Sequence, residues 1–162
     1  MMIAALFFFL GSQDLVDNPE FKAWASFKPG SSVTFTYLKD GKASTLEQKT
    51  TLKSVADDLV VVETQMILEG KAGGQAVERK VAPKLPADQA GKKLRDGDEE
   101  IEAGGRKLAC RWGEFEKKVP GGKTVISKIW VHDDVPGRAV RMEFSTDGVT
   151  KTGMVASAWD RK

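Results

Sequence analysis

The chain has 162 residues, of which 41% are hydrophobic and 30% charged, with a formal net charge of +2. This length suits one domain, and this composition is typical of a soluble globular protein rather than a disordered one. Because basic and acidic residues are interspersed and no basic face is evident, we expect no nucleic-acid partner. The single cysteine, Cys110, excludes an intrachain disulfide and a Cys-rich zinc motif.

The first thirteen residues have the pattern of a secretory signal peptide. An unbroken apolar run from Ile3 to Leu10 is too short to span a bilayer but has the length of a signal-peptide core. The small residues Gly11 and Ser12 follow it. No Lys or Arg precedes the run and the cleavage site is weak, so a buried first strand or a misassigned start is the alternative. We predict export to the periplasm or beyond, with a β-rich domain over residues 14–162.

The segment that follows predicts one short helix over residues 19–27. Asn18 suits the N-cap, Pro19 the first helical position and Glu20 the positive end of the helix dipole. The apolar residues Phe21, Trp24 and Ala25 are spaced i, i+3 and i+4, so they fall on one helical face. A Pro-Gly pair at 29–30 then ends the helix.

From residue 31 onward, apolar residues alternate with polar ones, which predicts β-strands. Turn signals recur between the alternating runs, so we expect a mainly β fold, an antiparallel meander of about nine strands. Such a sheet must cover its apolar face by forming a curved sheet, a half-barrel or a barrel, with the helix over the concavity. Residues 82–98 contain two prolines and no alternation, which predicts a long connecting loop with a turn of helix after Pro86.

Hairpin lengths predict the register of two strand pairs. A three-residue loop at 56–58 places Leu52 opposite Val62 and Leu46 opposite Leu68, so that apolar residues face each other. The Pro-Gly-Gly turn at 120–122 sets the register of the second pair, which contains Cys110 and His132.

A three-residue loop at 120–122 pairs Trp112 with Trp130 and Cys110 with His132. A two-residue turn is the alternative, but it shifts the register by one and leaves no favourable pair. Continued across the next turn, the first register pairs Trp130 with Arg141, Val131 with Val140 and Ile129 with Met142. One face of these strands is then expected to be aliphatic core. The other face is expected to carry Cys110, both tryptophans, His132 and a row of charges.

The sequence His132-Asp133-Asp134 invites a metal or catalytic interpretation. Adjacent strand residues point to opposite faces, so three in a row do not converge on one ion. A Cys110–His132 dyad would need a base beside the thiol, but no orienting residue or oxyanion donor is identifiable. Asx-turn chemistry, followed by Pro136-Gly137 in a type II turn, explains the motif better. We therefore predict no metal, no cofactor and no catalytic residue.

Aromatic residues supply the candidates for a binding site. Four tryptophans in this length favour an aromatic-lined groove for an apolar ligand or an extended peptide. The alternative is that Trp112 and Trp130 pack beneath the N-terminal helix against Phe21 and Trp24. The predicted ligand-binding residues are Trp24, Phe35, Val62, Met66, Trp112 and Trp130.

Three stretches, "NPEFKAWASFKPGSSV", "GDEEIEAGGRKLACRW" and "KIWVHDDVPGRAVRME", together with the apolar N-terminus, resemble a type of small exported bacterial protein with no established activity. By strand pattern alone, the architecture is similar to the LolA/LppX-like lipoprotein carriers, whose curved sheets hold acyl chains. No functional residue of that group matches a position here. The resemblance therefore implies a fold and a class of ligand, and no site.

These observations lead to three hypotheses about function. The first is a non-enzymatic extracytoplasmic protein that holds an apolar or lipid-like ligand, or an envelope partner, on a curved sheet. The second is a structural or interaction domain with a filled core. The third is a hydrolase or isomerase that uses Cys110 and His132.

Overall fold

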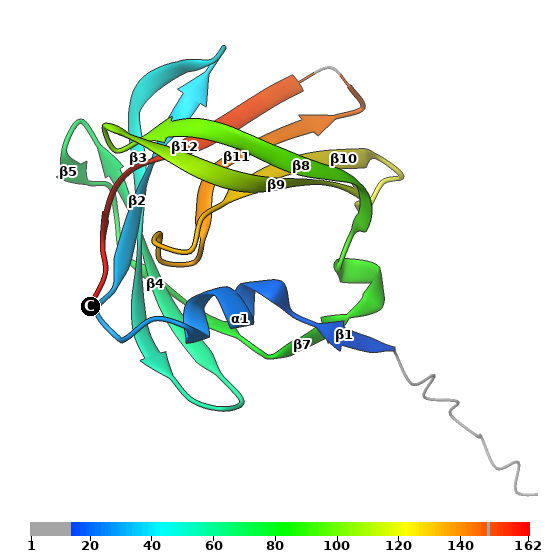
Figure 1. Ribbon diagram of the computed structural model, residues 1–162, viewed down its shortest axis with the longest axis horizontal. Coiled ribbons are helices and arrows are strands. Elements are labelled where there is room, and N and C mark those ends of the chain that lie inside the picture. Colours follow the sequence, from blue (N-terminus) through cyan, green and yellow to red (C-terminus); the bar gives the residue numbers. More distant parts are fainter. Residues whose placement is uncertain (1–13, 149) are drawn as a thin grey trace, which may run out of the picture.

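The computed structural model describes residues 14–148 and 150–162, and one open, curved antiparallel sheet dominates it (Figure 1). The ten strands run in the order β5-β4-β3-β2-β12-β11-β10-β9-β8, with β6 also beside β4, so β8 forms one edge and β5 and β6 the other. The predicted mainly β antiparallel fold is confirmed, as a curved sheet that is not closed into a barrel. The strands are β2 (Ser32–Lys39), β3 (Lys42–Val55), β4 (Val60–Leu68), β5 (Lys71–Ala72), β6 (Val77–Val81), β8 (Lys92–Ala103), β9 (Arg106–Lys118), β10 (Thr124–Val131), β11 (Ala139–Thr146) and β12 (Thr150–Asp160).

The remaining elements form a strap, residues 15–25 and 84–89, on the concave side of the sheet (Figure 1). It consists of β1 (Leu15–Asp17), α1 (Pro19–Ala25), β7 (Lys84–Pro86) and the 3-10 turn η1 (Ala87–Gln89), and β1 pairs with β7. Asn18 caps the helix, since its side chain accepts the Glu20 N–H at 3.0 Å. The predicted helix is confirmed, although it ends at Ala25. The predicted signal segment lies outside the described residues.

The predicted long loop at 82–98 is shorter than expected. It contains β7 and η1, and β8 already begins at Lys92. The turn of helix predicted after Pro86 is confirmed as η1. The first half of β8 lacks apolar alternation because most of its side chains are exposed at the sheet edge, which explains why its sequence looks like a loop.

The first predicted register is confirmed. Leu52 lies opposite Val62 and Leu46 opposite Leu68. The connecting loop has four residues rather than three, and a β-bulge between Leu52 and Ser54 absorbs the difference.

The second predicted register is also confirmed in its centre, where Trp112 faces Trp130. Its extension to the strand end is wrong, because β10 ends at Val131, which pairs with Arg111. Cys110 therefore has no strand partner at His132. A bulge after Trp130 also pairs Val131 with Ala139 instead of Val140.

The predicted roles of the two sheet faces need correction. The face of Trp130 and Cys110 is closed, since these side chains are only 3% and 2% exposed. The hairpin of β8 and β9 extends past the end of β10, contacts β11 and β12, and places Gly104 against Trp159. The opposite face of β10, with Ile129 and Val131, borders open space.

The turn at 133–138 has the predicted type II geometry. Gly137 has φ +73°, and the Arg138 N–H donates to the Val135 carbonyl at 2.7 Å. Asp133 and Asp134 form ion pairs with Arg138 and Arg161 instead of Asx-turn bonds. The His132-Asp133-Asp134 motif and the turn after it thus end strand β10 and place the Arg138 side chain on the concave side of the sheet.

Candidate ligand-binding cavity

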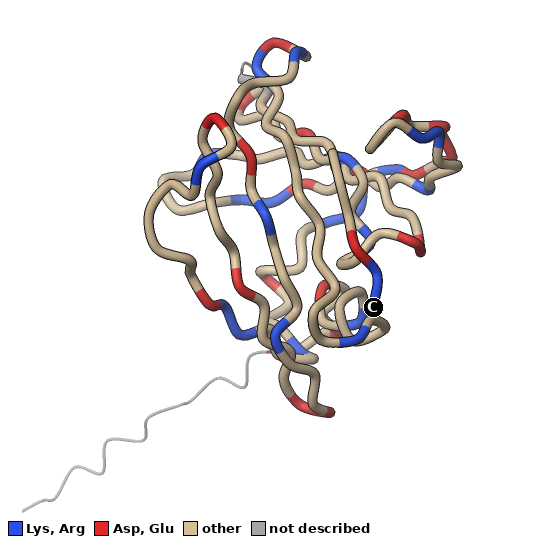
Figure 2. The backbone as a smooth tube through the Cα atoms, turned by 90° about the vertical axis from the view of Figure 1, so that its left-hand side faces the viewer, with Lys and Arg blue, Asp and Glu red and all other residues tan. Residues whose placement is uncertain are grey.

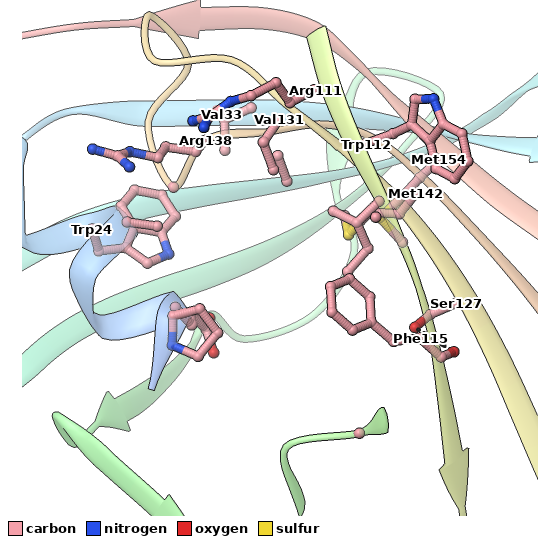
Figure 3. A pocket seen from close by; sticks show the side chains of 18 of the residues that line it. Trp24, Val33, Arg111, Trp112, Phe115, Ser127, Val131, Arg138, Met142 and Met154 are labelled. Atoms are coloured by element: carbon pink, nitrogen blue, oxygen red, sulfur yellow. Dashed lines mark hydrogen bonds between the residues drawn. The ribbon is translucent and has the colours of Figure 1, made fainter. Parts of the chain in front are cut away.

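An open cavity of about 1090 Å³ lies between the concave face of the sheet and the strap. The curvature creates it, because α1 reaches only part of the concave face and contacts β3 and β4. Figure 3 shows Trp24 on one side of this space and Phe115 projecting into it from β9.

The walls of the cavity are mostly apolar. Strand alternation directs every second residue of five strands inward, which gives a continuous surface of aliphatic, aromatic and thioether side chains. A surface of this kind suits an alkyl chain, because methionines and branched side chains fit ligands of irregular shape. The apolar lining comprises Trp24, Val33, Phe35, Phe115, Ile129, Val131, Ala139, Met142 and Met154.

Charged groups occupy the rim of the cavity and differ in their pairing. Arg79 forms a two-fold salt bridge with Glu20 of α1, one arm of which is 2.8 Å, and this contact holds the pKa of Arg79 above its usual range. Lys93 pairs with Asp96. Arg111 and Lys117 have no carboxylate within 4 Å among the described residues.

The structure brings together some of the six predicted binding residues. Trp24 and Phe35 line the cavity. Val62 is fully buried in the core, and Met66 is half-buried on β4 outside the cavity lining. Trp112 belongs to the wall, but its indole turns away from the cavity (Figure 3).

Trp130 lies on the opposite face of the sheet from the cavity, together with the indole of Trp112. The Nζ of Lys128 lies 4.1 Å from the Trp112 ring centre and 4.3 Å from that of Trp130. The Trp130 indole N–H donates to Glu99 at 2.8 Å, and this bond, with the nearby Lys128, lowers the pKa of Glu99. The alternative position beneath the helix is thus wrong for both tryptophans, which instead form a cation–π stack with a structural role.

Cys110 and His132 make no hydrogen bond to each other in the described chain. Burial, and secondarily the charge of Glu99, raises the pKa of the Cys110 thiol. His132 Nδ1 accepts the Asp134 N–H at 3.2 Å within the turn. A nucleophilic cysteine needs a lowered pKa and an adjacent base, so this arrangement offers no support for the dyad. Within the described ranges, no three potential ligand side chains gather as a metal site.

Several residues of the cavity were missed from the sequence. Ile129 and Val131 were assigned to a closed core, and Met142 was expected beside Ile129 in that same core. Arg111 and Arg138 were not singled out at all. The alternation of β9 does predict that Arg111 shares a face with Phe115, so the signal for one arginine was present. Arg138 sits in a turn, where alternation predicts nothing.

Lysines, arginines and acidic residues are interleaved along the backbone (Figure 2), in agreement with the absence of a basic face in the sequence. No helix in residues 14–148 or 150–162 has the length and apolarity needed to cross a membrane.

Comparison with solved structures finds a similar chain in Bacteroides fragilis NCTC 9343, the protein BF2203, described as exported and as having a YmcC-like fold. The two chains are 10% identical and align with a TM-score of 0.55 over 83% of this chain and 97% of that one. At this identity the likeness shows the fold alone. No protein-family model and no curated protein matches the chain. The similarity to LolA/LppX-like carriers therefore stays a prediction.

Proposed function

We propose that the protein is a non-enzymatic extracytoplasmic binding protein that holds an apolar chain, such as a lipid acyl group, in the cavity of its curved sheet. The observation that carries this proposal is the open space of about 1090 Å³ with a mainly apolar wall. Ligand pockets typically measure about 300–1,000 Å³ and combine apolar walls with a few polar groups.

The cavity favours this function over a structural domain with a filled core. Exposed apolar surface is unfavourable in water by about 25 cal/mol per Å², so an unfilled apolar concavity is a cost that a ligand removes. The strap covers only part of the concave face. Val33 and Phe35 are buried, whereas Met142 and Met154 are half-buried and line the open space. An envelope protein that inserts an apolar segment is the second candidate occupant, favoured by the openness of the cavity on one side.

Export to the periplasm or beyond is part of the proposal. It is supported by the apolar pattern of residues 1–13 and by the description of the Bacteroides fragilis protein as exported. Lipid carriers with curved sheets provide an analogy for the ligand class, which rests on the strand pattern. The absence of an enzymatic activity stays a prediction.

Titration with the uncharged fluorescent probe N-phenyl-1-naphthylamine tests the proposal. Ser127 lines the cavity on β10, whereas Ser145 on β11 pairs with Ile126 and faces the other way. We expect enhanced fluorescence with the wild-type protein and the Ser145→Trp variant, and weaker enhancement with Ser127→Trp, because its indole occupies part of the cavity. Equal binding by both variants, or no binding by wild type, would refute the proposal.

A further inference from the structure

Two arginines lie at the same end of the cavity. Arg111 pairs with Val131 across the strands, and Val131 pairs on its other side with Ala139, the residue directly after Arg138. Because neighbouring strands are about 4.8 Å apart, the two backbones are about 10 Å apart. Both side chains extend in the same direction above Trp24 (Figure 3). Two arginine side chains that start from backbones this far apart can both contact one shared anion.

The hydrogen-bonding capacity of both guanidinium groups is largely unused. Arg111 makes no hydrogen bond or ion pair to any described residue. Asp98 lies opposite Arg111 in the register, but its carboxylate is not within 4 Å. Arg138 has Asp133 Oδ1 at 3.5 Å from its buried Nε, which makes no hydrogen bond within the described chain. Its terminal nitrogens likewise have no acceptor among the described residues.

This arrangement differs from that of the other arginine on the rim. Arg79 is neutralised by Glu20, which fastens the strap to β6. Arg111 has no carboxylate within 4 Å among the described residues, and Arg138 pairs only with Asp133, at 3.5 Å from its Nε. The terminal nitrogens of both arginines therefore stay available beside an apolar wall. Guanidinium groups bind carboxylates and phosphates through paired N–H donors, so the complementary group is an oxyanion.

We infer that the cavity takes an anionic amphiphile, with a carboxylate or phosphate head group between Arg111 and Arg138 and its alkyl chain along Ile129, Met142 and Met154. This inference rests on the proposed function. The head group is expected to be an anion because both arginines are cationic. The alkyl chain is expected to lie along the apolar wall that begins beside Val131.

Displacement of N-phenyl-1-naphthylamine by four ligands with dodecyl-length chains tests the inference. The ligands are dodecanoic acid, dodecyl phosphate, dodecanol and dodecyltrimethylammonium, each below the concentration at which it aggregates. We expect the two anions to displace the probe at concentrations about tenfold lower than dodecanol, because charge-assisted hydrogen bonds are stronger than neutral ones. The order of the two anions tells a carboxylate-preferring site from a phosphate-preferring one, and either order supports the inference.

Matched variants identify the groups responsible. Arg111→Gln and Arg138→Gln are expected to weaken the anions about tenfold each and to leave dodecanol unchanged. Arg106→Gln on the other face, above Trp159, is the control. The inference is overturned if dodecanol binds as tightly as the anions, or if the control weakens them equally. Failure of the probe itself to bind would instead refute the proposed function, and the inference with it.

Discussion

Trp130 and Glu99 are joined by a 2.8 Å hydrogen bond that ties edge strand β8 to β10 on the face away from the cavity. Trp130 is 3% exposed, and Glu99 is the only acceptor of its indole N–H among the described residues. This contact secures the hairpin that closes one face of the sheet, while the other face stays open to a ligand.

The Trp130–Glu99 contact predicts that Glu99 contributes more to the free energy of unfolding than its neighbour Glu100. Glu99→Ala should lower the free energy of unfolding by about 1–3 kcal/mol, because the buried indole N–H loses its acceptor. Glu100→Ala removes only an exposed pairing with Lys107 and should change it by less than about 0.5 kcal/mol. Urea denaturation of the two variants measures the difference, and equal effects would show that the bond has no structural role.

Gly137 and Trp24 predict a second stability difference. A Cβ at Gly137 would lie 2.7 Å from the Trp24 ring, at a residue with φ +73°. Gly41 has a similar φ of +75° with nothing within 4 Å. Gly41→Ala should therefore cost about 1–2 kcal/mol from backbone strain alone. Gly137→Ala should lower the free energy of unfolding by clearly more, because the added Cβ also clashes with Trp24. If chemical denaturation shows Gly41→Ala to be the more destabilising variant, the close packing of Gly137 against Trp24 is contradicted.

The thiol of Cys110 should be unreactive in the folded protein. Burial and the charge of Glu99 raise its pKa, which lowers the thiolate fraction at neutral pH. We expect slow reaction with Ellman's reagent under native conditions and rapid reaction of one thiol in urea. Fast labelling of the native protein would revive the hypothesis of a nucleophilic cysteine.

Asp17 anchors the strap and predicts a pH dependence. Hydrogen bonds from Lys22 and then Lys84 lower its pKa from 3.8 to about 2. A carboxylate with a depressed pKa contributes stability that is present above pH 3.8 and is lost as the pH falls toward 2. An NMR titration should give a midpoint near 2 in the wild type and a higher one in the Lys22→Ala, Lys84→Ala double variant. An unchanged midpoint would exclude the lysines as the cause.

The sequence predicted the strand registers but not which face of the strands opens onto a cavity. Alternation fixes which residues share a face, so the pairing of Trp112 with Trp130 followed from turn length and cross-strand complementarity. Which face is covered depends on how the β8–β9 hairpin bends over β11 and β12, and no local pattern encodes that bend. Trp130 was therefore assigned to the binding site, and Ile129 to the core.

Irregular backbone accounts for the other differences. The bulge after Trp130 shifted the pairing of Val131, and the bulge after Leu52 lengthened the next loop. The contribution of Arg138 depends on a turn that aims its side chain, which composition alone does not reveal. The position of Trp24 and Phe35 on the cavity side was predictable, because helix and strand periodicity both direct large apolar residues inward.

Native mass spectrometry of detergent-free protein from an exported preparation tests whether the cavity holds an apolar chain. An added mass corresponding to an acyl-chain compound is expected on the wild type and on Ser145→Trp, with a smaller bound fraction for Ser127→Trp. Wild-type protein that carries no added mass under gentle ionisation, and takes up none when incubated with dodecanoic acid, would show that the cavity does not hold such a chain.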